Sequence, residues 1–268
     1  MEFPLSGVEV SPIVPVLVGF CVATLTTPVG VSGAFLLLPF QVSVLGFTTP
    51  GVTPTNLLFN VISTPGGITG YRRAGAVDRT LARAIAAGAV PGVIIGSVLR
   101  VSLLAGADTF KLFAGAVLLV LGLHLVLASA RRKDTMPAAG EGSLRWVTAI
   151  AAVAGTIGGI YGISGGSIIA PFLVGVLHLP VRRVASAALV ATFITSCAGV
   201  LSFLVLDLAA AGASARPDWM LAALFGVGGM FGGRVGARLA PHLPERALRA
   251  LLGALAVGVG VSYLAPAL

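Results

Sequence analysis

Apolar stretches long enough to cross a lipid bilayer recur along this chain, separated by short polar segments. A helix rises about 1.5 Å per residue, so roughly 20 apolar residues span a hydrocarbon core of about 30 Å. With 57% hydrophobic and only 10% charged residues among 268, the chain lacks the charge that a soluble surface needs. The sequence therefore predicts an all-α polytopic membrane protein, a single membrane domain over residues 1–268. The stretches expected to cross are 54–70, 84–105, 109–128, 184–206, 219–238 and 247–266.

The basic residues are distributed unevenly between the loops. Four groups, at 72–83, 131–145, 182–183 and 234–249, hold fourteen of the 17 Lys and Arg residues; Arg100, Lys111 and Arg216 lie outside them. Short loops rich in Lys and Arg favour the cytoplasmic side. This dispersal explains the net charge of +8 as an orientation signal and argues against nucleic-acid binding. We therefore expect a multi-pass protein of the inner or plasma membrane with both termini outside.

A motif is repeated at a constant offset of 132 residues. Gly-x-Ser-Gly, followed after five residues by Pro-Phe, occurs at residues 30–40 and again at 162–172. The same offset relates Leu57 to Leu189 and Gly67 to Gly199, and a later offset of 138 relates Gly122 to Gly260. The pattern predicts two repeats, 12–128 and 146–266, joined by a cytoplasmic linker at 129–145.

Each repeat would contain a paired segment, 12–46 or 146–179, that begins and ends on one side of the membrane, followed by three crossings. Three is odd, so the second repeat starts from the opposite face. The sequence thus predicts an inverted-topology repeat with about 8–10 membrane segments, an architecture of many secondary transporters.

The repeated motif interrupts each paired segment with residues that disfavour continuous helix. Proline, glycine and hydroxyl residues are concentrated at 26–33 and 158–167. Where a helix restarts after such a break, its free N–H groups and positive dipole end favour an anion. We expect Ser32 and Ser164 at the N-cap positions of the restarted helices. The alternative is that the glycines only allow close helix packing.

Polar side chains follow each break. Asn56, Asn60 and Ser63 share a helical face by their spacing. Interhelical hydrogen bonding is the usual role of such residues, but we expect one or two to reach the substrate. The predicted substrate-binding residues are Gly30, Ser32, Gly33, Asn56, Asn60, Gly162, Ser164, Gly165, Gly166, Thr192 and Thr195.

All nine acidic residues fall in predicted termini or loops. Without a carboxylate at mid-membrane, the chain lacks the usual ligand for a cation pump or proton relay. We expect no catalytic residue, metal site or cofactor.

At these motifs the chain resembles the TauE/SafE family of sulfite and organosulfur-anion exporters. The resemblance covers nearly the whole chain and rests on the two Gly-rich stretches, the polar segments after them, the turn at 72–75 and the glycine-rich segment 232–239. The first copy has Gly33-Ala34 where the second has Gly165-Gly166. The resemblance implies transport of sulfite, a sulfonate or a related anion.

The function predicted is secondary transport, as an exporter, of a small anion bound between the two breaks. The expected partners are that anion and the lipid bilayer, with a homodimer among the open oligomeric states. An anion channel is the nearer alternative, since broken helices also build pores. An intramembrane serine protease, suggested by Gly-x-Ser-Gly, is disfavoured because the motif occurs twice and no histidine is suitably placed.

Overall fold

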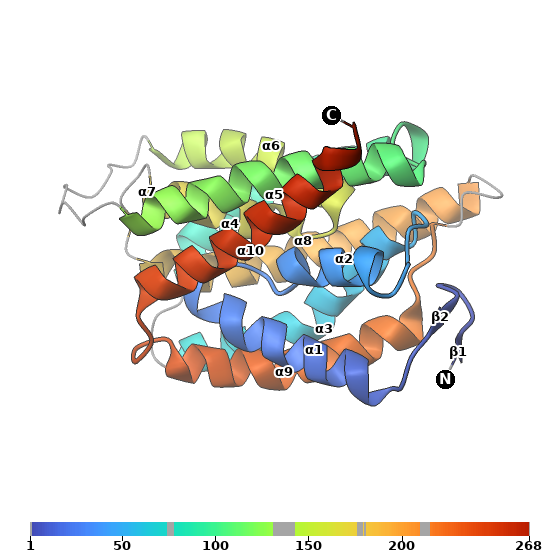
Figure 1. The fold of residues 1–268 in the computed structure, drawn as a ribbon. Coiled ribbons are helices and arrows are strands. Elements are labelled where there is room, and N and C mark those ends of the chain that lie inside the picture. Colours follow the sequence, from blue (N-terminus) through green and yellow to red (C-terminus); the bar gives the residue numbers. More distant parts are fainter. Residues whose placement is uncertain are drawn as a thin grey trace.

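The computed structural model describes residues 2–73, 78–130, 143–175, 179, 181–209 and 215–267. Its long helices lie side by side, parallel or antiparallel (Figure 1). A short hairpin of β1 (Glu2–Phe3) and β2 (Val8–Glu9) precedes them. The helices are α1 (Ile13–Thr26), η1 (Thr27–Val29), α2 (Ala34–Ser43), α3 (Val52–Arg73), α4 (Arg79–Ser102), α5 (Ala107–Ala130), α6 (Ser143–Tyr161), α7 (Ser164–Gly175), α8 (Val181–Ala209), α9 (Trp219–Leu239), α10 (Glu245–Leu264) and η2 (Ala265–Ala267).

Within the described residues, six helices are long and apolar enough to cross a membrane: α4, α5, α6, α8, α9 and α10. The chain is thus an all-α, multi-pass membrane protein. Helix α3, which we predicted to cross, is 22 residues long but is not among the six. Its polar residues explain this, since Thr53, Asn56 and Asn60 are fully buried inside the bundle. The polar side chains of α3 are therefore covered by neighbouring helices, which is why α3 can lie in the bundle without a long apolar surface.

Two pairs of helices pack closely through glycines. A Cβ on Gly228 of α9 would lie 1.9 Å from the Val16 carbonyl oxygen of α1, and one on Gly88 of α4 would lie 2.0 Å from the Thr148 carbonyl oxygen of α6. Only glycine allows backbones to approach so closely. In Figure 1, α1 and α9 run together along the lower edge. The contacts continue one and two turns on, at Gly232 and Gly236 against Phe20 and Thr24, and at Gly92 and Gly96 against Ala152 and Thr156.

Helices α3 and α8 contact each other reciprocally. A Cβ on Gly67 would lie 3.0 Å from a methyl of Leu189, and one on Gly199 would lie 2.7 Å from a methyl of Leu57. These are the residues that the 132-residue offset relates. Leu57 precedes Gly67 along α3, but their partners on α8 come in the reverse order, Gly199 and then Leu189, so the two helices run antiparallel. Helices α5 and α10 behave likewise, with Gly122 against Gly253 and Gly115 against Gly260.

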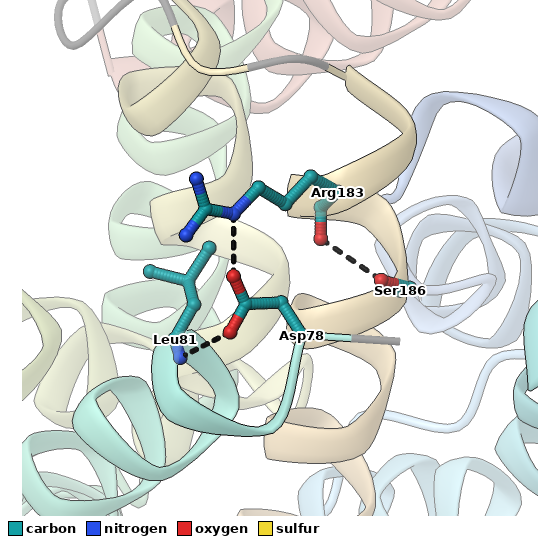
Figure 2. A network of polar contacts seen from close by, with 4 residues as sticks. All are labelled: Asp78, Leu81, Arg183 and Ser186. Carbon is teal, nitrogen blue, oxygen red and sulfur yellow. Dashed lines mark hydrogen bonds and ion pairs between the residues drawn. The ribbon is translucent and has the colours of Figure 1, made fainter. Parts of the chain in front are cut away.

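The helix ends gather at two opposite ends of the bundle. At one end, Asp78 caps α4 by accepting the Leu81 N–H at 2.9 Å and pairs with Arg183 at the start of α8 (Figure 2). We call this the basic end, because Arg72, Arg79, Arg145, Arg183, Arg238 and Arg246 lie at the helix ends there.

At the opposite end, Asp218 caps α9 by accepting the Leu221 N–H at 2.9 Å and also binds Ser6. Asp78 and Asp218 are 140 residues apart, so the offset between α4 and α9 exceeds the 138 found for α5 and α10. Arg216 pairs with Asp207 at this end, and Arg100 and Lys111 also lie here. The described residues do not include most of the predicted linker 129–145, with Arg131, Arg132 and Lys133. They also do not include residues 210–214 of the loop before α9.

Candidate functional site

Both predicted breaks occur, and each turns on a left-handed glycine. Gly30 has φ +76° and Gly162 has φ +94°. A side chain would also collide at both positions, since a Cβ on Gly30 would lie 2.7 Å from the Ala185 Cα and one on Gly162 would lie 2.9 Å from the Thr53 carbonyl oxygen. Glycine is required here both by conformation and by space.

The two breaks meet inside the bundle. The Ser32 N–H, in the first break, donates to Ser167 Oγ in the first turn of α7 at 3.0 Å. The Tyr161 hydroxyl, at the second break, donates to the Phe35 carbonyl in the first turn of α2 at 3.1 Å. Segments more than 120 residues apart are thus joined by hydrogen bonds in both directions.

Helices α3 and α8 complete a buried polar group at this junction. The Ser32 hydroxyl donates to Asn60 Oδ1 of α3, and the Ser167 hydroxyl lies 3.3 Å from Thr192 Oγ1 of α8. All four side chains are at most 3% exposed. Asn60 and Thr192 are themselves related by the 132-residue offset. We call Ser32, Asn60, Ser167 and Thr192 the serine cluster.

Three buried polar atoms on these elements lack a partner among the described residues: Asn60 Nδ2 in the serine cluster, Ser164 Oγ at the start of α7, and Ser196 Oγ, four residues after Thr192 on α8. Buried polar atoms are nearly always paired, so these are available to a ligand. Ser164 is also the one non-glycine residue in the described chain with positive φ, at +63°. Strained backbone of this kind is concentrated at functional sites.

The serines differ from the predicted helix caps. Ser32 precedes the N-cap residue Gly33, although its hydroxyl still accepts the Ala34 N–H at 3.1 Å. Ser164 is the first residue of α7, and its hydroxyl caps nothing in the described structure. The prediction of two N-capping serines is therefore wrong for both, since Gly33 holds the N-cap position of α2 and Ser164 lies inside α7. The physical reason is that Ser164 has a left-handed backbone, with φ +63°, whereas an N-cap residue needs an extended one.

The remaining predicted residues divide into packing and polar positions. Gly33, Gly165 and Gly166 are each pressed against a neighbour: Phe59, Ala89 and the Ala188 carbonyl, respectively. These contacts show that the three glycines allow close packing, which was the alternative considered from sequence.

Asn56 accepts a hydrogen bond from Gln41 Nε2 at 2.8 Å, outside the serine cluster. Thr195 donates to the Ala191 carbonyl of its own helix at 2.8 Å. The structure therefore brings Ser32, Asn60 and Thr192 together, whereas Asn56 and Thr195 are engaged elsewhere.

A small pocket adjoins the first break, with room for about one water molecule. It is lined by Ser32, Ser63 and Thr64, and by Gly229 of α9. Ser63 and Thr64 follow Asn60 toward the end of α3 that carries Arg72. The pocket thus extends from the serine cluster toward the basic end.

Sequence reasoning missed two residues of the junction and one beside it. Ser167 was in the second break but was not among the predicted ligands, and Tyr161 precedes its glycine. Arg100 was only noted as lying outside the four basic groups, yet it is fully buried in the last turns of α4. An arginine near the end of an apolar stretch is a weak sign by itself, because most such arginines extend to the membrane surface.

The family assignment agrees with this geometry. The family model described as "Sulfite exporter TauE/SafE" matches residues 15–263. The chain belongs to this family. It is also similar to a "Probable membrane transporter protein YunE" of Bacillus subtilis (strain 168), with 22% identity over 92% of this chain and 95% of that protein. No solved structure matches the chain.

Family membership and fold together identify the TauE/SafE chain as a membrane transporter. The protease alternative gains no support from the serines. A catalytic serine needs a base within hydrogen-bond reach. Ser32 donates to the Asn60 amide, and Ser164 has no partner in the part of the chain that the structure describes.

Proposed function

We propose that this transporter carries a small oxyanion, most specifically sulfite, a sulfonate or a related organosulfur anion, and binds it at the serine cluster. The observation that carries the proposal is the hydrogen bond from the Ser32 N–H to Ser167 Oγ. It joins two helix starts at one buried polar point. Helix starts present N–H donors and positive dipole ends, which favour an anion.

The charges and donors around the cluster support the same ligand class. Asn60 Nδ2 and the Ser164 and Ser196 hydroxyls can each donate, and none has a partner among the described residues. Among the acids that the structure describes, each lies in the N-terminal hairpin or at a helix end, as Asp78 and Asp207 do. A cation would therefore meet no carboxylate at the cluster, whereas an anion would meet several donors.

We further propose that the two halves form an inverted-topology repeat. Support comes from the reciprocal contacts of α3 with α8 and of α5 with α10, since each pair is related by the sequence offset and runs antiparallel. The matched packing of α1 on α9 and α6 on α4 adds to it. In this arrangement the basic end is cytoplasmic, the termini are outside, and the protein resides in the plasma membrane.

The proposed direction is export. The inside-negative potential favours outward movement of an anion by about 2.3 kcal/mol per charge at 100 mV, which equals roughly 50-fold accumulation outside. Uniport of the anion needs no coupling ion. Clamping the potential to zero at a constant pH gradient should then reduce efflux. Unchanged efflux would favour proton coupling instead.

The function is tested by counterflow in proteoliposomes loaded with unlabelled sulfite and given labelled sulfite outside. Trans-acceleration is expected, because a carrier must return its site across the membrane. Flux without trans-acceleration would identify a channel, and no flux of sulfite or sulfonates would refute anion transport.

The serine cluster is tested with Gly33→Val and Ser32→Ala in the same assay. A Cβ on Gly33 would already lie 2.9 Å from Phe59, so valine would distort the break and should abolish counterflow. Thr156→Val is the matched control, since among the described residues that hydroxyl bonds its own helix alone, at the Ala152 carbonyl at 3.1 Å. Normal transport by both Gly33→Val and Ser32→Ala would place the site elsewhere.

A further inference from the structure

Arg100 is buried on all sides at the end opposite the basic groups. Its side chain has 0% exposure. Nε donates to Thr53 Oγ1 of α3 at 3.2 Å, and Nη1 donates to the Leu104 carbonyl. The guanidinium carbon lies 3.9 Å from the centre of the Phe110 ring of α5. The side chain therefore contacts three segments and reaches neither lipid nor water.

The guanidinium charge has no counter-ion among the residues that the structure describes. No carboxylate among the described residues lies within salt-bridge distance of Arg100, and its Nη2 has no hydrogen-bond partner there. By contrast, the two arginines that form ion pairs, Arg183 and Arg216, are 50% and 60% exposed. A buried charge is costly unless it is paired. The burial of Arg100 therefore needs an explanation.

The surroundings of Arg100 connect it to the second break. Thr53, which accepts from Arg100, donates in turn to the Ile160 carbonyl at 3.0 Å. A Cβ on Gly162 would lie 2.9 Å from the Thr53 carbonyl oxygen and 3.0 Å from the Asn56 Cβ. Thr53 thus lies between Arg100 and the second break, and Asn56 lies one turn further along α3.

Asn56 supplies a second unpartnered donor on this path. Its Oδ1 accepts from Gln41, which leaves Asn56 Nδ2 and Gln41 Oε1 without partners in the described structure. If both amides are turned over, the free donor becomes Gln41 Nε2 instead. In either assignment one amide NH2 and the guanidinium Nη2 stay unpaired beside the second break.

We propose that Arg100 and the Asn56–Gln41 amide pair form a second anion subsite, on the side of the serine cluster away from the basic end. Its ligand is a small oxyanion with two oxygens free for guanidinium and amide donors, as in sulfite or a sulfonate. The residue 140 positions after Arg100 is Ala240, so the second half has no equivalent cation. The subsite is therefore particular to one end of the transporter. This inference rests on the proposed function for the meaning of the subsite, but binding can be tested without transport.

The experiment is an anion titration of the purified protein in detergent, with sulfite and with methanesulfonate, at constant ionic strength. Binding is read from calorimetry and from the shift of the thermal unfolding midpoint. We expect Arg100→Gln to weaken the affinity about 10- to 100-fold, because a hydrogen bond to a charged group is lost together with the charge. Arg100→Lys, which keeps the charge, should lose less than Arg100→Gln, and Asn56→Leu should weaken binding as well. Arg216→Gln removes an exposed arginine from the same end and should bind like the parent.

Sidedness separates binding from a structural role. In oriented proteoliposomes, Arg100→Lys should raise the half-saturating anion concentration on the Arg100 side and leave that on the basic side unchanged. A merely structural arginine would alter both sides equally or lower the amount of folded protein.

Either of two results would overturn the subsite: parental affinity in folded Arg100→Gln, or no anion binding by the parent protein. Counterflow by the parent together with either result would leave the proposed function standing. Arg100-dependent binding without any counterflow would support the subsite and refute the proposed transport function.

Discussion

The hydrogen bond between Ser32 and Asn60 allows a quantitative test of the junction by a double-mutant cycle. In Ser32→Ala, both Asn60 Oδ1 and the Ala34 N–H lose their partner. A buried polar group left unpaired costs about 1–3 kcal/mol, so with two such groups the single variant should lose about 2–6 kcal/mol. In Asn60→Leu, only the Ser32 O–H loses its acceptor, and we expect a loss of about 1–3 kcal/mol.

The double variant should be less unstable than the sum of the single ones. With both side chains gone, only the Ala34 N–H remains unpaired. Those costs alone would give a coupling of about 2–6 kcal/mol. Interhelical hydrogen bonds in membranes average about 0.6 and reach about 1.7 kcal/mol, because the unfolded helices also find partners, so the expected coupling is at most about 1.7 kcal/mol. Reversible unfolding in mixed micelles measures the four free energies, with Thr156→Val as a control for loss of a hydroxyl within one helix. Additive effects would show that Ser32 and Asn60 do not interact and would refute the account of the junction.

Three further predictions concern packing, charge and topology. Gly228→Ala should strongly destabilise the fold, because its Cβ would lie 1.9 Å from the Val16 carbonyl oxygen, whereas Gly258→Ala, with nothing within 4 Å, should be neutral or stabilising in thermal unfolding. Burial raises the pKa of Asp78, but the Leu81 N–H and Arg183 outweigh it, so the net pKa lies below the ordinary 3.8. The stability from this lowered pKa is complete above the unfolded pKa and is lost as pH falls through the folded one; it should be at most about 1 kcal/mol and absent from an acid titration of Asp78→Asn. In a background without Cys21 and Cys197, Thr49→Cys and His242→Cys should react with an impermeant reagent from opposite faces, and labelling of both in intact cells would contradict the proposed topology.

The positions of five of the six long apolar helices, α4, α5, α8, α9 and α10, and of both breaks could be predicted from sequence, because each depends on local information; α6 was expected only as part of a paired segment. The length of an apolar stretch defines a helix such as α4, and a glycine motif marks a break such as Gly162. The constant offset also identified Leu57 with Leu189 and Gly67 with Gly199, pairs that meet in space. Local pattern and repetition carried these predictions.

The partners of the helices could not be predicted in the same way. Helix α1 packs on α9 and α6 packs on α4, so each half contributes a helix to the packing of the other. Val16 and Gly228 are separated by more than 200 residues, and their contact leaves only a glycine spacing in the sequence. The burial of Arg100 follows from the enclosing segments at Thr53, Leu104 and Phe110, and no pattern around Arg100 indicates them.

The two halves differ in the helix residues that pack beside each break, and this difference explains where the pocket lies. Beside the first break, α9 contributes Gly229, which lines the pocket. The residue 140 positions earlier, on α4, is Ala89, whose methyl would lie 2.7 Å from a Cβ on Gly165. One turn on, α4 has Val93 against Gly199, where α9 has Gly233. Glycines on α9 leave space toward the basic end, whereas alanine and valine on α4 fill the matching position. If the carrier alternates as proposed, its second state must move α4 away from α7 and α8 and cannot be a simple exchange of the two halves.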